Sequence, residues 1–363
     1  MLKEHISLGQ IFAVVLSFNL GSSLVLGIGI KGKEDAWLVV FSSSLLGIII
    51  TIFFYYLIEM LPKKNLYELF AYCYNRKIAI ILSFIYIIYF FYLACRVIRD
   101  FTELTSSIIL PLTPIEIITL SLTLLMGYIL YMGIEVLSRT TEVLLPYSIV
   151  FLITLAIFLY ASGNIIFSKI TPILAQGIKP LMKVIFPYEL VRPYGQMVAF
   201  TCVFPLVANF RTGKNIVLLA ITISGLFLTL STLLITLSLG SNSVSKVSFP
   251  LLSATRLVSI GGFIERIDAI SVFIIMLGIL VKSGIFIYAG MMGLEYIFKI
   301  SYRYFTIPII CIISMFTIFI ARGISDHILE GFMIIPYFLS IPLEFALPVF
   351  LAASLLVKRK LKK

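Results

Sequence analysis

The sequence predicts an all-α integral membrane protein with about ten transmembrane helices. Of its 363 residues, 61% are hydrophobic and 12% are charged, and the mean hydropathy is +1.12. No soluble globular domain needs so much apolar surface. The apolar residues form long continuous runs without the alternation typical of strands. Helices are therefore expected, because they satisfy all backbone polar groups within each lipid-exposed span.

The apolar runs divide into two sets of five. The first set covers residues 6–30, 36–61, 78–98 (continuing to about 109), 115–133 and 143–163, and the second about 186–210, 216–239, 267–288, 305–321 and 332–357. An odd number of spans per half gives the second half an inverted orientation. We therefore predict one transmembrane domain over 1–363, with a first repeat at 6–163, an extracellular-side connection at 164–183, a second repeat at 184–357 and a basic tail at 358–363.

The positions of lysine and arginine predict the orientation in the membrane. With the amino terminus inside, the larger share of these residues, including the basic tail 358–363, lies in the cytoplasm. Both termini are therefore expected to be cytoplasmic. The net charge of +11 is assigned to these membrane flanks, so no nucleic acid partner is expected.

The first apolar run contains the small polar stretch Gly21, Ser22 and Ser23. Weak helix formers inside a span indicate a helix that opens there and offers backbone groups to a small ligand. The corresponding sixth run is also irregular, with Pro187, Pro205 and the stretch 192–196. We interpret the first and sixth runs as paired broken helices around a midplane site. The alternative is that they are ordinary spans, since proline and glycine are common in transmembrane helices.

Lys282 lies deep within the eighth run. A buried ammonium costs several kcal/mol unless it is paired or hydrated, so it is a candidate functional group. The alternative is that the side chain reaches toward the cytoplasmic surface. The functional hypothesis places it between the first and eighth spans near Gly21, where it substitutes for a coupling cation or relays a proton.

The third run ends in Arg96, Arg99, Asp100 and Glu103, at the i,i+3 and i,i+4 spacings of a local ion-pair network. Direct contact with a zwitterionic ligand is the alternative role. At the start of the eighth run, four further residues are expected to fix the preceding segment by structural ion pairs. They are Arg256, Glu265, Arg266 and Asp268.

The candidate ligand-binding residues are drawn from four spans. Tyr89 and Tyr92 share one face of the third span, where core packing is the alternative role. Gln196 offers both a donor and an acceptor for a small polar ligand. The full set is Gly21, Ser22, Ser23, Tyr89, Tyr92, Tyr194, Gly195, Gln196 and Met276.

No catalytic constellation is present in the sequence. The two histidines, His5 and His327, lie away from any apparent apolar pocket, so no catalytic triad is expected. The phosphate-binding loop sequence is also absent. The four widely spaced cysteines match no metal or disulfide pattern. We expect neither an enzyme nor a bound metal or cofactor.

Several motifs together resemble one membrane family. They are 6–10 followed by Gly21, Asp35-Ala36-Trp37, 99–103 leading to 110–114, and 249–250 with 256–270. This combination resembles the B subunit of bacterial spore germinant receptors, the GerAB-type endospore germination permease family. The resemblance implies a member of the amino acid/polyamine/organocation (APC) superfamily with the LeuT-type fold. It also implies a nutrient-binding subunit of the spore inner membrane, with a membrane A subunit and a C lipoprotein as partners.

The chain departs from the family pattern near the expected pocket. The family often carries a proline where this chain reads Leu26-Gly27-Ile28-Gly29, a Gly-Glu pair at Gly195-Gln196, and a tryptophan near Met276. The identity of the nutrient therefore does not transfer.

Three functions are compatible with these observations. The first is a sensor that binds a nutrient such as an amino acid and signals to partner subunits in germination. The second is an amino acid permease coupled to protons or cations. The third is a purely structural membrane partner.

Overall fold

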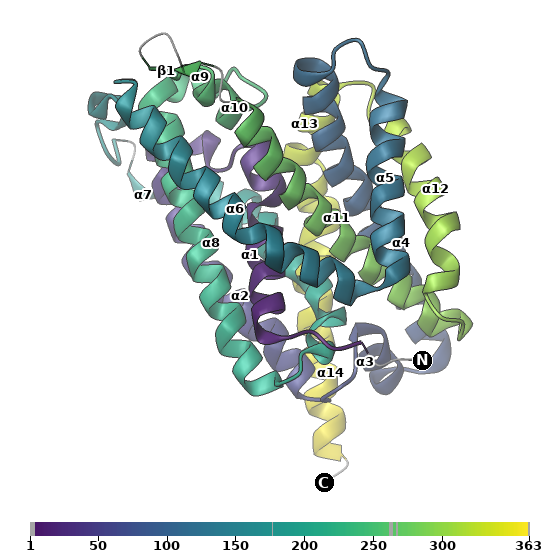
Figure 1. Ribbon diagram of the computed structural model, residues 1–363. Helices are drawn as coiled ribbons and strands as arrows, with labels where there is room; N and C mark the ends of the chain where they lie inside the picture. The colour runs from purple at the N-terminus through teal and green to yellow at the C-terminus, as the bar shows by residue number, and fades with distance from the viewer. Residues whose placement is uncertain (1–3, 176, 261–263, 266–267, 362–363) are drawn as a thin grey trace.

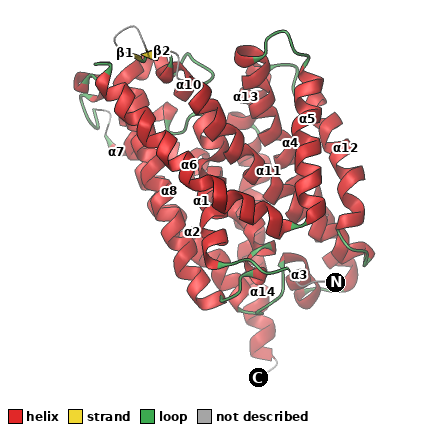
Figure 2. Ribbon diagram, viewed as in Figure 1, coloured by secondary structure: helices red, strands yellow, loops and turns green. Residues whose placement is uncertain are grey.

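The computed structural model is a bundle of helices (Figure 1) and describes residues 4–175, 177–260, 264–265 and 268–361. Figure 2 shows that helices make up almost the whole described chain. The strands of the described part are β1 (Ser259–Ile260) and β2 (Ile264–Glu265), which pair antiparallel in a two-stranded ribbon. The prediction of an all-α membrane protein is confirmed.

Eight helices of the described chain are long and apolar enough to cross a membrane. They are α1 (Leu8–Leu26), η1 (Ile30–Asp35) with α2 (Ala36–Glu59), α4 (Arg76–Leu104) with η2 (Thr105–Ile109), α5 (Ile115–Met132), α6 (Ile134–Ala161), α8 (Phe210–Leu239), α11 (Asp268–Phe298), and η7 (Pro336–Ala346) with α14 (Leu347–Leu361). A ninth span forms if α12 (Arg303–Phe319) and α13 (Ile324–Met333), which meet at a bend of 100°, are taken together.

The expected sixth span is a series of short irregular helices. In order they are α7 (Ile178–Val184), the π-helical η4 (Ile185–Tyr194), and the 3-10 helices η5 (Gly195–Cys202) and η6 (Phe204–Leu206). Pro187 and Pro193 supply no backbone N–H donor, and Arg192 has an extended backbone (φ −115°, ψ 121°) between helical turns. This irregularity explains why eight or nine spans, and not ten, are recognised by length.

The remaining short elements lie in the connections. They are α3 (Leu66–Cys73), η3 (Phe167–Ile170), α9 (Ser241–Val244) and α10 (Pro250–Thr255). Both chain termini lie at one end of the bundle, which we call the terminal end (Figure 1). The opposite, distal end carries α9, α10, the β1–β2 ribbon and α13.

α1 and α11 are the central helices of the bundle. In each of them, 78% of the most apolar stretch is buried, compared with 28% in the peripheral α6. The exposed apolar side chains of α6, such as Val150 and Tyr160, are suited to contact with lipid. Functional groups on α1 and α11 are therefore shielded from lipid.

α1 begins at an N-terminal capping box, in which Ser7 and Gln10 exchange side-chain and backbone hydrogen bonds. Its helical geometry is interrupted at Gly21 (φ −21°, ψ −111°). At this point α1 and α11 approach closely, because a Cβ atom added to Gly278 would lie 2.6 Å from the Gly21 Cα. The interruption is thus in backbone contact with the other central helix.

The segment before α1 joins several elements at the terminal end. The backbone N–H of Ile6 donates to Leu206 O (3.0 Å), and the N–H of Ala208 donates to Ile6 O (3.1 Å). Glu4 Oε1 accepts from Tyr302 OH (2.6 Å) and Arg303 Nη2 (2.8 Å). The start of α1 is therefore tied both to the end of η6 and to the beginning of α12.

The close contact of α1 with α11 predicts the effect of Gly278→Ala. Alanine ordinarily stabilises a helix interior relative to glycine by up to about 1 kcal/mol. Here the added methyl group overlaps the backbone of Gly21, and overpacking costs about 1–3 kcal/mol. We expect the melting temperature of the purified protein in detergent to fall.

Gly323→Ala is the matched control, because a Cβ atom there meets no described atom within 4 Å and its backbone is extended (φ −177°). A Gly278→Ala protein as stable as this control would show that the two helices are not in backbone contact.

Candidate functional site

Lys282 of α11 extends along the irregular part of α1. Its side chain is fully buried, and Nζ donates a hydrogen bond to Ser22 Oγ at 3.0 Å. Nζ also lies 5.2 Å from the centroid of the Phe18 ring. A Cβ atom on Gly21 would lie 3.1 Å from Lys282 Cδ. The ammonium therefore lies inside the bundle next to α1 and reaches neither surface.

The polar end of α4 binds α13 and, through hydrogen bonds from Arg99 to carbonyls of α12, also α12. Arg96 Nη1 pairs with Glu330 Oε2 at 2.9 Å, and Arg96 Nη2 donates to His327 O at 2.6 Å. Asp100 Oδ1 lies 2.6 Å from Nε2 of the fully buried His327. In the predicted local network, only Arg99 and Glu103 pair with each other, through Arg99 Nε and Glu103 Oε1 at 2.9 Å. Arg96 and Asp100 instead bridge to α13.

The two candidate tyrosines also contact the last part of the chain. Tyr92 OH donates to Glu330 Oε1 at 2.7 Å. Tyr89 OH donates to Glu344 Oε1 at 2.6 Å and lies 3.1 Å from Ser340 Oγ. Glu344 is fully buried, and its Oε2 lies against Gly195, where a Cβ atom would overlap it. Both hydroxyls are thus used within the protein.

A small cavity lies where α1, α4, η4, η5, α13 and η7 meet. Its lining residues are Ser22, Leu93, Arg96, Val97, Asp100, Val191, Arg192, Gln196, Gly331, Ile335, Pro336 and Ser340. Its volume of about 30 Å³ has room for about two water molecules and not for an amino acid. Gln196 is 4% exposed, and its Oε1 has no hydrogen-bond partner among the described residues. One residue of the cavity lining thus carries an unused hydrogen-bond acceptor.

The structure separates the predicted ligand-binding residues into two groups. Ser22 and Gln196 line the cavity, and Gly21, Ser23 and Gly195 are their chain neighbours. Tyr194 packs instead against Gly47 of α2. Met276 is partly buried on α11 and does not appear in the described lining of the cavity.

The structure describes some of the residues that were predicted to form ion pairs before α11. Arg256 Nε lies 3.4 Å from Asp268 Oδ2 at the distal end, far along α11 from Lys282. Glu265 belongs to β2, but its side chain lies outside the described structure, as does Arg266. The Arg256–Asp268 pair supports the β1–β2 connection and does not contribute to the cavity.

Several site residues were not found from the sequence. Glu344 and Glu189 are buried carboxylates within apolar stretches, a signal that was available. His327 was set aside because it lay away from any apparent apolar pocket, yet it is fully buried beside Asp100. Its pairing could not be predicted, since it depends on the bend between α12 and α13.

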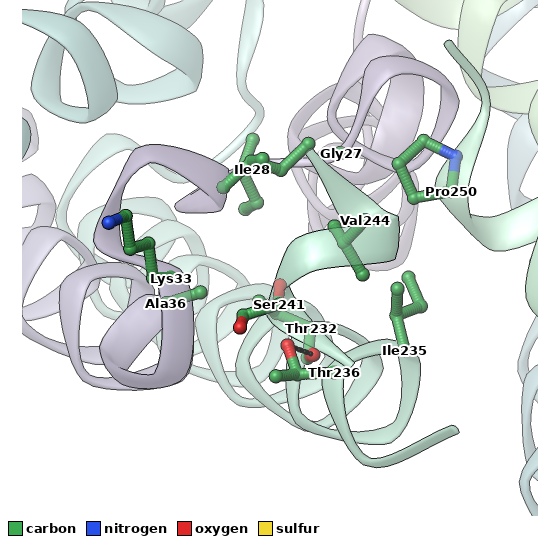
Figure 3. Close-up of a pocket in the computed structure, with 11 residues that line it drawn as sticks. Gly27, Ile28, Lys33, Ala36, Thr232, Ile235, Thr236, Ser241, Val244 and Pro250 are labelled. Carbon is green, nitrogen blue, oxygen red and sulfur yellow. Dashed lines mark hydrogen bonds between the residues drawn. The ribbon is translucent and has the colours of Figure 1, made fainter. Parts of the chain in front are cut away.

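A second, separate pocket lies at the distal end (Figure 3). Gly27, Ala36, Thr236 of α8, Val244 of α9 and Pro250 of α10 are among its lining residues. The ammonium of Lys33 points away from the other labelled side chains. With a volume of about 10 Å³, this pocket holds at most about one water molecule.

The fold and the buried polar cavity define a multi-pass membrane protein with an internal polar site. Residues 5–325 match the sequence profile of the family described as spore germination protein. This match covers most of the chain, and the chain therefore belongs to the spore germination protein family. The resemblance noted in the sequence is confirmed.

Three relatives illustrate the similarity. The chain is 30% identical to spore germination protein KB of Bacillus subtilis (strain 168), over 99% of this chain and 97% of the relative. It is 24% identical to spore germination protein YndE of the same organism, over 78% of each chain. It is 25% identical to spore germination protein XB of Bacillus anthracis, over 70% of each chain. All three names describe germination proteins.

The buried pair Arg99–Glu103 predicts a strong effect of Glu103→Gln. Its two side chains are only 5% and 11% exposed. Loss of one partner leaves a buried charge uncompensated, which costs about 3–5 kcal/mol. The protein also contains a matched exposed pair, Glu135 with Arg139, at the same i,i+4 spacing.

For the exposed pair, Glu135→Gln should cost less than about 1 kcal/mol. The measurement is thermal unfolding of both variants in the same detergent. Equal losses of stability in Glu103→Gln and Glu135→Gln would show that burial of the ion pair does not increase the effect.

Proposed function

We propose that the protein is a nutrient-sensing transmembrane subunit of a spore germinant receptor. It binds a small molecule such as an amino acid in the cavity beside Ser22 and Gln196. The observation that carries this proposal is the cavity, a polar site deep in the bundle between the interruption of α1 and the irregular η4–η5 segment. Polar groups at such depth are costly and mark functional sites in membrane proteins.

The proposed architecture is the LeuT-type arrangement of the APC superfamily. Residues 6–163 and 184–357 form inverted repeats within one domain, and 358–363 is a basic cytoplasmic tail. Two observations support it. The first element of each half is interrupted, at Gly21 and at Arg192, and both termini lie at the same end of the bundle (Figure 1). The proposed location is the spore inner membrane, with both termini in the cytoplasm.

The proposed signal is a change in the equilibrium between conformations. A nutrient does not fit into about 30 Å³, so binding must stabilise an arrangement with a larger cavity. The α13 segment lines the cavity through Gly331 and is joined to α4 by Arg96–Glu330 and Asp100–His327. We propose that the resulting movement is transmitted to a membrane A subunit and a C lipoprotein, the partners that the family resemblance implies.

A second candidate function is an amino acid permease coupled to protons or cations. The buried ammonium of Lys282 favours it, because Nζ lies against the interruption of α1, where it can substitute for a coupling cation. The binding site is the same in both candidates, so fold alone does not separate them.

Gly21→Leu tests the proposed site. A side chain at Gly21 would meet Gly278 O at 2.9 Å and displace Lys282. We expect spores with this variant to lose most of their nutrient-triggered germination, while Gly323→Leu, at an open position, leaves it unchanged. Germination is followed by the fall in optical density after addition of amino acids, sugars and nucleosides. Normal responses of Gly21→Leu spores to every nutrient would exclude this site.

Uptake by proteoliposomes separates a sensor from a permease. For a sensor, we expect saturable binding of a labelled nutrient without accumulation inside the vesicles. For a permease, accumulation should occur, and in Lys282→Met it should lose its dependence on a proton or cation gradient. This substitution keeps most of the length of the side chain and removes its charge. Accumulation by the wild-type protein would overturn the sensor proposal.

A further inference from the structure

Arg192 is a charged residue of the cavity lining that forms no ion pair with any described carboxylate. It lies in η4 at the point where the backbone is extended, and it lines the cavity with Gln196. Among the described residues, no carboxylate lies within ion-pair distance of its guanidinium and no hydrogen bond is formed. By contrast, the neighbouring Arg96 is paired with Glu330 and donates to His327 O. Arg192 therefore has donors available for a ligand.

The one described contact of the Arg192 guanidinium leaves those donors free. Its Cζ lies 4.7 Å from the centroid of the Phe332 ring of α13. An aromatic ring covers the face of a guanidinium, whereas the N–H groups point outward in its plane and can bind both oxygens of a carboxylate. Phe332 thus acts as a positioning residue that orients Arg192 without occupying its hydrogen bonds.

A complementary acceptor lies four residues further along the chain. Gln196 lines the same cavity, its side chain is 4% exposed, and its Oε1 has no hydrogen-bond partner among the described residues. A buried acceptor left unpaired costs about 1–3 kcal/mol, so a ligand that donates to it gains affinity. The cavity therefore presents donors on one residue and an acceptor on the other.

The charges around Arg192 restrict the net charge of the ligand. Arg192 experiences the attractive fields of Asp100, Glu189 and Glu344 as well as the repulsion of Arg96. Charges of both signs therefore surround the site, and the buried ammonium of Lys282 lies next to Ser22 of the same cavity. A ligand with a net charge brings the full cost of desolvating that charge into a buried site. A zwitterion adds a carboxylate and an ammonium group together and leaves the net charge of the site unchanged. The rest of the lining, including Leu93, Val97 and Ile335, is apolar.

We propose that Arg192 determines the specificity of this cavity for a small aliphatic zwitterion. The carboxylate of the ligand binds the in-plane N–H groups of Arg192, its ammonium donates to Gln196 Oε1, and its side chain packs on the apolar lining. This assignment rests on the proposed function, because it names the ligand class of the same cavity.

The experiment compares acids with their amides on the full-length protein in lipid nanodiscs. The probes are L-alanine, L-valine and L-leucine, each beside its primary amide, with D-glucose and inosine as uncharged probes. For the wild-type protein, we expect at least one amino acid to bind, and its amide to bind about 10- to 100-fold more weakly. This comparison needs no variant, so it is independent of any folding defect.

Variants then assign the preference to Arg192. In Arg192→Gln the acid and the amide should bind with equal, weak affinity, and Arg192→Lys should recover part of the preference. Arg139→Gln is the matched control, since it removes a guanidinium whose side chain is 67% exposed, and it should retain the full preference. Melting temperatures report whether each variant is folded.

The possible failures are distinguishable. If the amide binds as well as the acid, or if Arg192→Gln keeps the preference, Arg192 does not recognise the carboxylate. If only D-glucose or inosine binds, the zwitterion assignment is wrong while the proposed nutrient sensor stands. If no probe of any class binds, the zwitterion assignment and the proposed function fail together.

Discussion

Irregular backbone inside a membrane must be shielded from lipid, because lipid offers no hydrogen bonds to free N–H and C=O groups. The rest of this structure depends on that constraint. The interruption at Gly21 lies on the central α1, against Gly278 of α11, and the extended residue Arg192 lies between helical turns of η4. The long helices α2, α4, α8 and α11 pack around these two segments. The bundle thus encloses two pieces of non-helical chain, and the polar cavity lies between them.

The buried charges are held by residues from different elements. Arg96 and Asp100 of α4 both bind to α13, which bends away from α12 by 100°. Such pairs contribute little net stability compared with apolar packing, because desolvation offsets most of their attraction. Both pairs join α13 to α4. An arrangement of α13 that breaks these pairs would leave the buried Arg96 and Asp100 without their partners, which is unfavourable.

Much of the fold was predictable from the sequence, because hydrophobic run length and helix formation in lipid are local properties. The small residues around Gly21 and the prolines of the sixth run correctly marked the irregular segments. The pairing of side chains could be predicted less well from the sequence. The i,i+4 spacing suggested that Arg96 binds Asp100, whereas Arg96 binds Glu330, more than two hundred positions away. Local spacing predicts only contacts within a helix, and the bend after α12 that brings Glu330 and His327 to α4 has no clear local signal. Arg192 lay within a recognised stretch, but its contact with Phe332 of α13 depends on the tertiary fold.

The hydrogen bonds of Ile6 with Leu206 and Ala208 have a mechanical consequence. They join the beginning of α1 to the end of η6, so the two irregular segments of the chain share one attachment point at the terminal end. If α1 separates from the η4–η5 segment while these bonds persist, that motion is a rotation about this point, with its largest displacement toward the distal end.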